Sequence, residues 1–120
     1  MKRIFFFSVP LLVALNLFAK EVYIDPGPNA QERLQEALIL IEEGDTLIIK
    51  SGYYKFEDGL SLDVDNVTVK GEGIDSTILD FKNQQSGAQG LLVTSDRVTL
   101  SDFSILDAKG DALKVIGAKG

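Results

Sequence analysis

A set of short apolar phrases that recur in the same order constrains this chain more than any other feature. From Thr46 onward the apolar residues follow a period of two, and the phrases are rich in strand-forming residues. Copies of the first phrase are 31 and 22 residues apart, copies of the second 31, and copies of the third 27. An ordered recurrence of this kind indicates a repeat architecture. The copies are residues 59–62, 90–93 and 112–115, then 66–69 and 97–100, then 77–80 and 104–107.

The unequal separations are explained by corner loops of different length within one repeating unit. Residues 72–75 and 82–89 are the expected extra corner residues, and without them the period approaches about 20 to 22 residues. Three short strands per unit, with small or polar residues at the corners, are typical of a right-handed parallel β-helix. We therefore predict an all-β solenoid of this type, in which each coil lies about 4.8 Å above the last.

The predicted stacking places like residues on like. Leu60, Leu91 and Leu113 are expected to form one internal ladder, and Val67 with Val98 a second. A β-sandwich is the alternative, since it also contains many short alternating strands. It does not explain why the phrases recur in order. The polar neighbours expected to face water are Thr68, Lys70, Thr99 and Ser101.

A single amphipathic helix is predicted before the repeats, preceded by a brief strand at 21–25. Asn29 is the expected N-cap, with Glu32 completing a capping box, and Gly44 suits the left-handed residue that ends a helix. One apolar face on a lone helix must be buried, and the end of the strand stack is the obvious place. The helix is therefore predicted to cap that end. Its apolar face comprises Ala30, Leu34, Ala37, Leu38 and Ile41.

The first residues have the layout of a secretory signal peptide. Lys2 and Arg3 precede an apolar run over 4–17, which is shorter than the roughly 20 residues of a spanning helix. We expect cleavage after Ala19 and a secreted or periplasmic protein, with an uncleaved N-terminal anchor as the alternative. The predicted organisation is a signal peptide at 1–19, a strand and capping helix at 20–44, and β-helix coils at 45–120.

Composition excludes several kinds of chemistry. The 120 residues suffice for one domain and contain neither His nor Cys, which removes His general bases, disulfides, thiolate nucleophiles and His or Cys metal sites. The formal net charge is −6. Such a surface repels nucleic acid and anionic lipid, so we expect no nucleic-acid partner and, after removal of the signal, no membrane partner.

Two stretches carry a resemblance to a known superfamily. Residues 37–54 lead from the helix through Gly-Asp-Thr to a strand and a Gly-Tyr corner, and residues 110–115 read GDALKV. Together they resemble secreted right-handed parallel β-helix proteins of the pectate-lyase-like superfamily. The resemblance implies polysaccharide lyases, hydrolases, esterases or epimerases, or non-catalytic sugar-handling solenoids. Enzymes of this superfamily usually carry their catalytic residues on middle coils, and we expect the chain to be the N-terminal piece of a longer protein.

Carboxylates are the chemistry available in quantity, yet the sequence assigns no catalytic, cofactor-binding or metal residue. Stacking could pair Asp63 with Asp65, Asp96 with Asp102, and Asp107 with Asp111, for Ca²⁺ binding or acid/base work. The favoured interpretation is that they are solvated corner residues. Residues 71–73 suggest a phosphate loop but lack the helix that must follow it.

Basic and aromatic side chains suggest a sugar-binding surface or, more simply, a solvated face and a packed corner. An acidic protein that binds a polyuronate needs a bridging cation, so Ca²⁺ is the one cofactor that the sequence suggests testing. Two functions remain open: a protein that binds or processes polysaccharide, and a non-catalytic surface or periplasmic scaffold. The residues concerned are Lys50, Lys55, Lys70, Arg97 and Lys114, and Tyr53, Tyr54 and Phe56.

Overall fold

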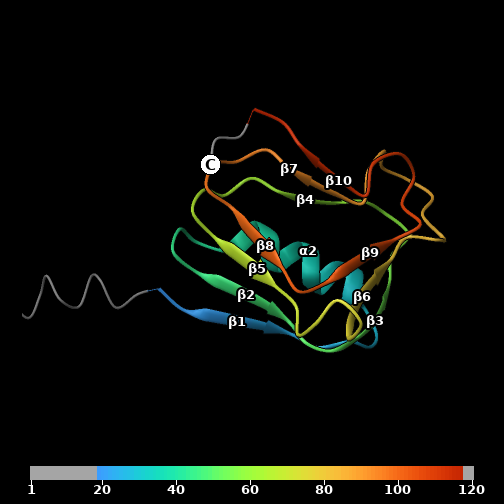
Figure 1. The fold of residues 1–120 in the computed structure, drawn as a ribbon, viewed down its shortest axis with the longest axis horizontal. Coiled ribbons are helices and arrows are strands. Elements are labelled where there is room, and N and C mark those ends of the chain that lie inside the picture. Colours follow the sequence, from blue (N-terminus) through green and yellow to red (C-terminus); the bar gives the residue numbers. More distant parts are fainter. Residues whose placement is uncertain (1–18, 118–120) are drawn as a thin grey trace, which may run out of the picture.

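The computed structural model describes residues 19–117, which contain three parallel β-sheets and one α-helix (Figure 1). The helix is α2 (Ala30–Leu40). Nearly all of the predicted signal peptide, residues 1–18, lies outside the described residues. The strands are β1 (Glu21–Ile24), β2 (Thr46–Ile49), β3 (Gly52–Lys55), β4 (Leu60–Leu62), β5 (Thr68–Lys70), β6 (Thr77–Asp80), β7 (Leu91–Val93), β8 (Thr99–Ser101), β9 (Ser104–Leu106) and β10 (Leu113–Val115).

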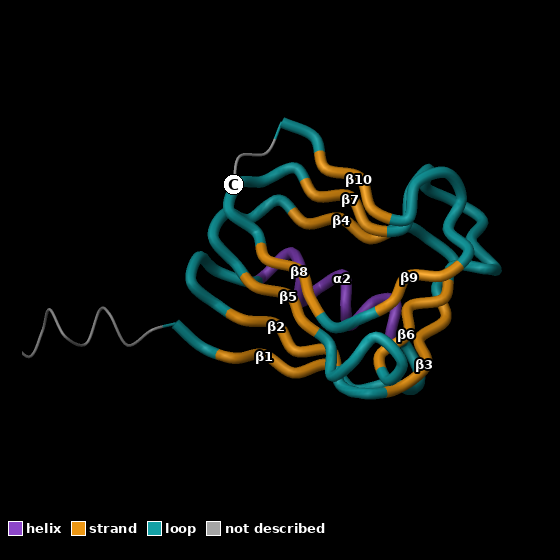
Figure 2. Tube along the Cα trace, in the orientation of Figure 1, coloured by secondary structure: helices purple, strands orange, loops and turns teal. Residues whose placement is uncertain are grey.

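The chain visits the three sheets in turn. Strands β2, β3 and β4 form a first pass, β5, β6 and β7 a second, and β8, β9 and β10 a third. Corresponding strands of successive passes pair in parallel, giving the sheets β1-β2-β5-β8, β3-β6-β9 and β4-β7-β10 (Figure 2). Two neighbouring parallel strands must be joined by a crossover connection. Here the crossover between two paired strands consists of the intervening strands in the other two sheets and the corners between them. The predicted all-β class with parallel strands is confirmed.

The register confirms the pairing of the first predicted ladder, although Leu113 at its end is 43% exposed, and it agrees with the second. Leu91 lies opposite Leu60 on one side and Leu113 on the other. Thr68 lies opposite Thr99, and the Val67 carbonyl accepts a hydrogen bond from the Thr99 N–H at 3.0 Å. Val67 is buried and Val98 packs against the same core. The polar neighbours predicted to face water are exposed or half-buried.

The third phrase stacks one residue away from the predicted register. Ile78 lies opposite Ser104 and Leu79 opposite Ile105, whereas the sequence phrases aligned Leu79 with Leu106. Six residues separate β5 from β6 but only two separate β8 from β9, where Asp102 turns the chain at φ 64°. A one-residue shift exchanges the two faces of a strand, so Leu106 points outward and is 40% exposed.

Helix α2 covers one end of the stack, as predicted. It contacts β1, β3 and β4, which are the first strands of the three sheets (Figure 1). Leu34 and Leu38 are buried by these contacts, together with Ala30 and Ile41. The cap itself differs from the prediction: Asn29 is the N-cap but adopts φ 62°, and its side chain makes no capping hydrogen bond. A side-chain cap normally requires extended backbone at this position.

The C-terminal end of the helix also corrects the prediction. The helix ends at Leu40, with Ile41 as C-cap, three residues before Gly44. Gly44 has φ 92° but belongs to the turn that leads into β2, where its N–H donates to the Asn66 carbonyl at 2.7 Å. The left-handed glycine therefore serves the entry to the first strand of the stack rather than the helix terminus.

Two glutamines of the helix satisfy backbone groups at the uncovered edge of the first pass. The Gln35 amide donates to the Ser61 carbonyl at 3.1 Å and its oxygen accepts from the Ser61 N–H at 3.0 Å. The Gln31 oxygen accepts from the N–H groups of Glu57 and Asp58 at 3.0 and 3.1 Å. These amides take the place of a neighbouring strand, which keeps the edge from pairing with another chain.

Replacing Gln35 with leucine is expected to lower the free energy of unfolding by about 1–3 kcal/mol, because Ser61 loses both partners. Urea unfolding measured by circular dichroism tests this. Glu36→Leu is the matched control, since Glu36 is exposed on the next position of the same helix. Equal losses in the two variants would show that the Gln35 contacts contribute nothing specific.

The core runs between the three sheets and is closed under the helix by aromatic rings. Phe56 is fully buried, with its ring centroid 5.0 Å from that of Phe81 and 6.4 Å from that of Tyr54. The Tyr54 hydroxyl donates to the Lys50 carbonyl at 2.7 Å, which satisfies its one polar group. Burial raises the pKa of Tyr54 to about 12.

Candidate functional site

The outward face of the β3-β6-β9 sheet carries a row of mixed aromatic, charged and apolar side chains. Tyr53, Ile78 and Ser104 lie opposite one another, and so do Lys55, Asp80 and Leu106. The intervening residues, Tyr54 and Leu79, point into the core. Strand alternation thus places one set in the interior and the other on the surface. We call this surface the Tyr53 face, comprising Tyr53, Lys55, Ile78 and Asp80.

Tyr53 and Asp80 form the fixed centre of the Tyr53 face. The Tyr53 hydroxyl donates a short hydrogen bond to Oδ2 of Asp80, and the Lys82 N–H donates to Oδ1 at 2.8 Å. Asp80 is nearly buried by these neighbours, whereas the Tyr53 side chain is 51% exposed. The hydroxyl is therefore held in place while much of the ring remains accessible.

The same contact perturbs both groups. The hydrogen bond from Tyr53 lowers the pKa of Asp80, against the opposing effect of burial. The hydrogen bond to Asp80, followed by burial, raises the pKa of Tyr53. At neutral pH the pair is therefore a phenol donating to a carboxylate. Neither group is placed to give or take a proton near pH 7, which favours a binding role over acid/base chemistry.

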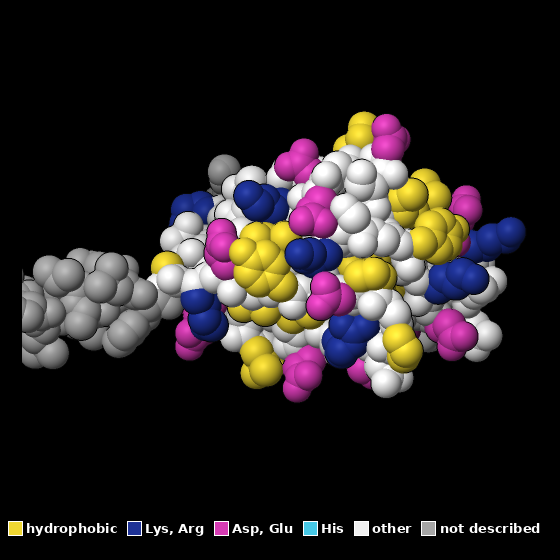
Figure 3. Space-filling model, turned by 90° about the horizontal axis from the view of Figure 1, so that it is seen from below, with side chains coloured by type: hydrophobic (Ala, Val, Ile, Leu, Met, Phe, Trp, Pro, Cys, Tyr) yellow, Lys and Arg dark blue, Asp and Glu magenta, His cyan; other side chains and the backbone are white. Residues whose placement is uncertain are grey.

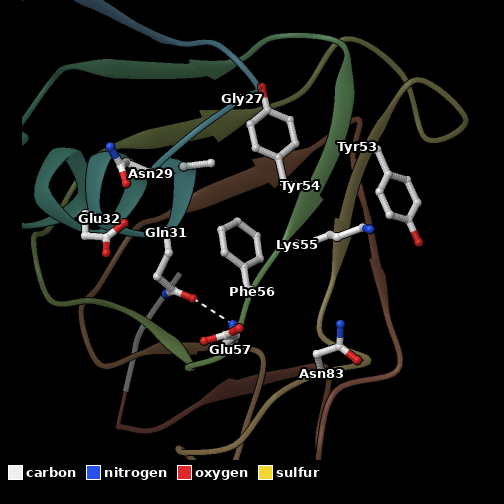
Figure 4. A pocket seen from close by; sticks show the side chains of 11 residues that line it. Gly27, Asn29, Gln31, Glu32, Tyr53, Tyr54, Lys55, Phe56, Glu57 and Asn83 are labelled. Carbon is white, nitrogen blue, oxygen red and sulfur yellow. Dashed lines mark hydrogen bonds between the residues drawn. The ribbon is translucent and has the colours of Figure 1, made fainter.

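A hollow of about 440 Å³ adjoins this face, between the start of helix α2 and strand β3. Figure 4 shows Tyr54 and Phe56 on the helix side of β3, and Tyr53 and Lys55 on its other side. The hollow is lined by polar groups and by the exposed ring of Tyr53, whereas Tyr54 and Phe56 beside it are buried. It offers hydrogen-bond donors and acceptors beside apolar ring surface, the combination that ligand pockets use. Its polar lining residues are Asn29, Gln31, Glu32, Tyr53, Lys55, Glu57 and Asn83.

The Tyr53–Asp80 contact predicts a pH-dependent contribution to stability. Because the folded pKa of Asp80 is lowered, the contribution is fully present above the unfolded pKa of about 3.9 and is lost as pH falls through the folded value. We expect the stability difference between wild type and Tyr53→Phe to be constant from pH 7 to about 4 and to shrink below it. Urea unfolding between pH 7 and 2 measures this, and an unchanged difference down to pH 2 would contradict it.

The predicted aromatic cluster divides between two roles. Tyr54 and Phe56 pack beneath the helix, as the simpler interpretation has it, and Tyr53 does not. Strand alternation explains this, since Tyr53 and Tyr54 are consecutive residues of β3. Of the predicted residues, the structure therefore brings Tyr53 and Lys55 together on one surface.

The predicted carboxylate pairs occupy corners between strands. Asp63 accepts from the Thr94 hydroxyl at 2.8 Å, and Asp65 accepts from the Asp96 N–H at 2.8 Å. These bonds link successive passes, which is a structural use of the acidic side chains. Among residues 19–117, no three Asp, Glu, His or Cys side chains lie close enough to hold a metal ion. Asp102 and Asp107 adopt φ 64° and 58° at their corners.

The basic residues proposed for anion binding lie on different sheets. Lys50 follows β2 and lies over the Tyr23 ring, 5.7 Å from its centroid. Lys55 belongs to β3, Lys70 to β5 and Lys114 to β10. Acidic and basic side chains are interspersed over the face shown in Figure 3. The structure therefore brings only Lys55 of this set to the Tyr53 face.

The segment at residues 71–73 is also a corner. The Glu72 carboxylate accepts from the Ser51 N–H at 2.6 Å, and the Glu72 N–H donates to the Thr77 hydroxyl at 3.0 Å. Hydrogen bonding to Ser51 lowers the pKa of Glu72, against burial. The contact with Ser51 ties the corner of the second pass to the first, so the segment has a structural role.

Sequence reasoning identified Tyr53 and Lys55 as candidates, but not Asp80 or the other polar residues that line the hollow. Asp80 ends β6, 27 residues after Tyr53, and the two meet only through the register of β3 with β6.

Within the described part of the chain, no helix is long and apolar enough to cross a membrane. Comparison with family models, curated proteins and solved structures finds no match to this chain.

Proposed function

We propose that this chain is the N-terminal cap and first coils of an exported right-handed parallel β-helix protein, of the pectate-lyase-like kind, that binds polysaccharide on its Tyr53 face. Three observations support the solenoid: the ordered recurrence of the phrases, the parallel pairing of successive passes, and the helix across one end. The half-exposed Tyr53 ring, held by Asp80, carries the binding proposal.

A sugar ring presents C–H groups on one face and hydroxyls around its edge. The exposed ring of Tyr53 offers a flat apolar surface for the first, at little cost in conformational entropy because its hydroxyl is already held. Lys55 and Asn83 offer donors for the second. The repeated spacing of parallel strands suits an extended, periodic ligand better than a compact one.

Binding is favoured over bond cleavage for the residues described. Glycoside hydrolysis uses a carboxylic acid whose pKa is raised, paired with a second carboxylate. Asp80 has the opposite perturbation, and both of its oxygens accept hydrogen bonds. Hydrolysis of the polysaccharide would therefore use residues other than those of the Tyr53 face. Ca²⁺ is the cofactor to test, because an acidic protein needs a cation to bind a polyuronate.

The alternative is a non-catalytic surface or periplasmic scaffold that binds another protein through the far end of the stack. Leu91 and Val93 are each 2% exposed, whereas their partners in β10, Leu113 and Val115, are 43% and 54% exposed. In a scaffold these residues would be covered by the bound protein. A scaffold would bind through this end, whereas a polysaccharide-binding protein would bind through the Tyr53 face.

Affinity electrophoresis of the secreted protein in polygalacturonate and xylan gels, with Ca²⁺ and with chelator, tests the proposal. Tyr53→Ala is expected to weaken retention about tenfold or more in affinity. Tyr23→Ala is the matched control, because Tyr23 is 53% exposed and its hydroxyl also bonds a carboxylate, that of Glu21. Retention that Tyr53→Ala leaves unchanged, or that both variants weaken equally, would contradict the proposal.

A further inference from the structure

The N-terminal edge of the described chain contains a buried carboxylate whose partners come largely from one residue. Asp45 is 1% exposed. Its Oδ1 accepts from the backbone N–H of Lys20 at 3.0 Å. Its Oδ2 accepts from the Lys20 ammonium and from the Glu42 N–H, each at 3.0 Å. Lys20 thus contacts both oxygens of Asp45.

The charges of this cluster do not balance. The Lys20 ammonium also forms an ion pair with Glu42 at 3.1 Å, so two carboxylates share one cation. Burial alone would raise the pKa of Asp45, but the hydrogen bonds from Lys20 and Glu42 outweigh it and the pKa is lowered. Asp45 is therefore ionised at neutral pH, and a positive charge on the Lys20 backbone nitrogen would give the second carboxylate a cation of its own.

The position of Lys20 makes that nitrogen accessible to processing. Lys20 lies directly before β1, its carbonyl accepts from the Thr46 N–H at 3.0 Å, and both Ala19 and Lys20 are exposed. Hydrolysis of the Ala19–Lys20 peptide bond by a signal peptidase consumes one water. It leaves a carboxylate on Ala19 and an α-ammonium group on Lys20.

We propose that Asp45 is the binding site for the α-ammonium group of Lys20 created by this cleavage, so that processing completes the N-terminal cap. This inference rests on the proposed export and cleavage after Ala19. The new group replaces a neutral N–H with a full positive charge at the same atom, 3.0 Å from Oδ1. Two cations then face the carboxylates of Asp45 and Glu42.

The stabilisation has a defined pH window. An unperturbed α-amino group has a pKa of about 7.7–8.0, and an ion pair with Asp45 raises it in the folded protein. The added stability is therefore fully present below the unfolded value and is lost as pH rises through the higher folded value. The charged groups that face the site are the carboxylates of Asp45 and Glu42 and the Lys20 side chain.

The test uses the full chain expressed with export, and a second chain with Gly-Ser inserted between Ala19 and Lys20. The insertion moves the α-ammonium group away from Asp45 while leaving the Lys20 N–H in place. We expect the protein that begins at Lys20 to melt about 4 °C or more above the inserted form at pH 6.5, and the difference to disappear at high pH. Asp45→Asn should remove the difference, whereas Glu43→Gln in the same turn should preserve it.

A direct titration of the Lys20 α-amino group by NMR provides a measurement that does not depend on how Asp45→Asn folds. A folded pKa well above 8 supports the site. An N-terminus other than Lys20 in the mass spectrum would overturn the proposed cleavage, and this inference with it. An N-terminus at Lys20 with an unperturbed α-amino pKa would overturn the Asp45 site alone and leave the export proposal standing.

Discussion

Replacing Phe56 with alanine is expected to lower the free energy of unfolding by about 3–5 kcal/mol. Phe56 is fully buried and packs between the rings of Tyr54 and Phe81 beneath the helix. Its removal takes away the buried ring and leaves a cavity that three elements would have to move to fill. Because small domains have about 5–15 kcal/mol of stability in total, a large fraction would be lost.

Urea unfolding followed by circular dichroism measures this loss. Tyr23→Ala is the control, since it removes an aromatic ring of similar size from an exposed position on β1. We expect it to change stability by about 0.5 kcal/mol or less. A Phe56→Ala variant no less stable than Tyr23→Ala would show that the aromatic rings beneath the helix are not packed as described.

The second large effect is expected at Gly71, where alanine should destabilise the protein by about 3 kcal/mol. A Cβ atom there would lie 2.3 Å from the Asp102 carbonyl oxygen and 2.9 Å from Cβ of Phe103. Both belong to the next pass. The Gly71 N–H donates to the Ser101 carbonyl at 2.9 Å, so relieving the clash also breaks a hydrogen bond between passes.

Gly27→Ala separates this clash from the ordinary cost of losing a glycine. Gly27 has φ 121°, and no atom beyond its two chain neighbours lies within 4 Å of the place that a Cβ would take, so alanine there meets backbone strain without a clash against the rest of the fold. In thermal unfolding, the melting temperature of Gly71→Ala should be lower than that of Gly27→Ala. If Gly71→Ala were as stable as wild type, the second and third passes would not lie as close together at Gly71 as the structure places them.

The parts of the fold that the sequence predicts are those set by local patterns. The apolar spacing of the helix identifies its buried face, and the Leu60, Leu91 and Leu113 ladder follows from three similar phrases. Asn29 is the N-cap as predicted, but its predicted side-chain cap is wrong because Asn29 adopts a left-handed backbone, which residue type alone does not determine. Gly44 likewise has a positive φ for a reason that lies in the next strand.

The register of the third phrase could not be obtained from the phrase itself. Matching Leu79 with Leu106 maximises sequence similarity, whereas the structure places Ile105 opposite Leu79. The corner at Asp102 is shorter than the corresponding corner of the second pass, and corner length sets the register. That Tyr53 rather than Tyr54 is the exposed ring could not be predicted either, because it depends on which residues of β3 face the core.

The most direct test of the account is an NMR titration of isotope-labelled protein with a short oligosaccharide of whichever polysaccharide the gels retain. We predict that the chemical-shift changes concentrate on the Tyr53 face and on Asn83 beside it, and that Tyr53→Ala abolishes them. Changes centred on the other two sheets, or on the exposed Leu113 and Val115 of β10, would contradict a binding role for the Tyr53 face and favour the scaffold.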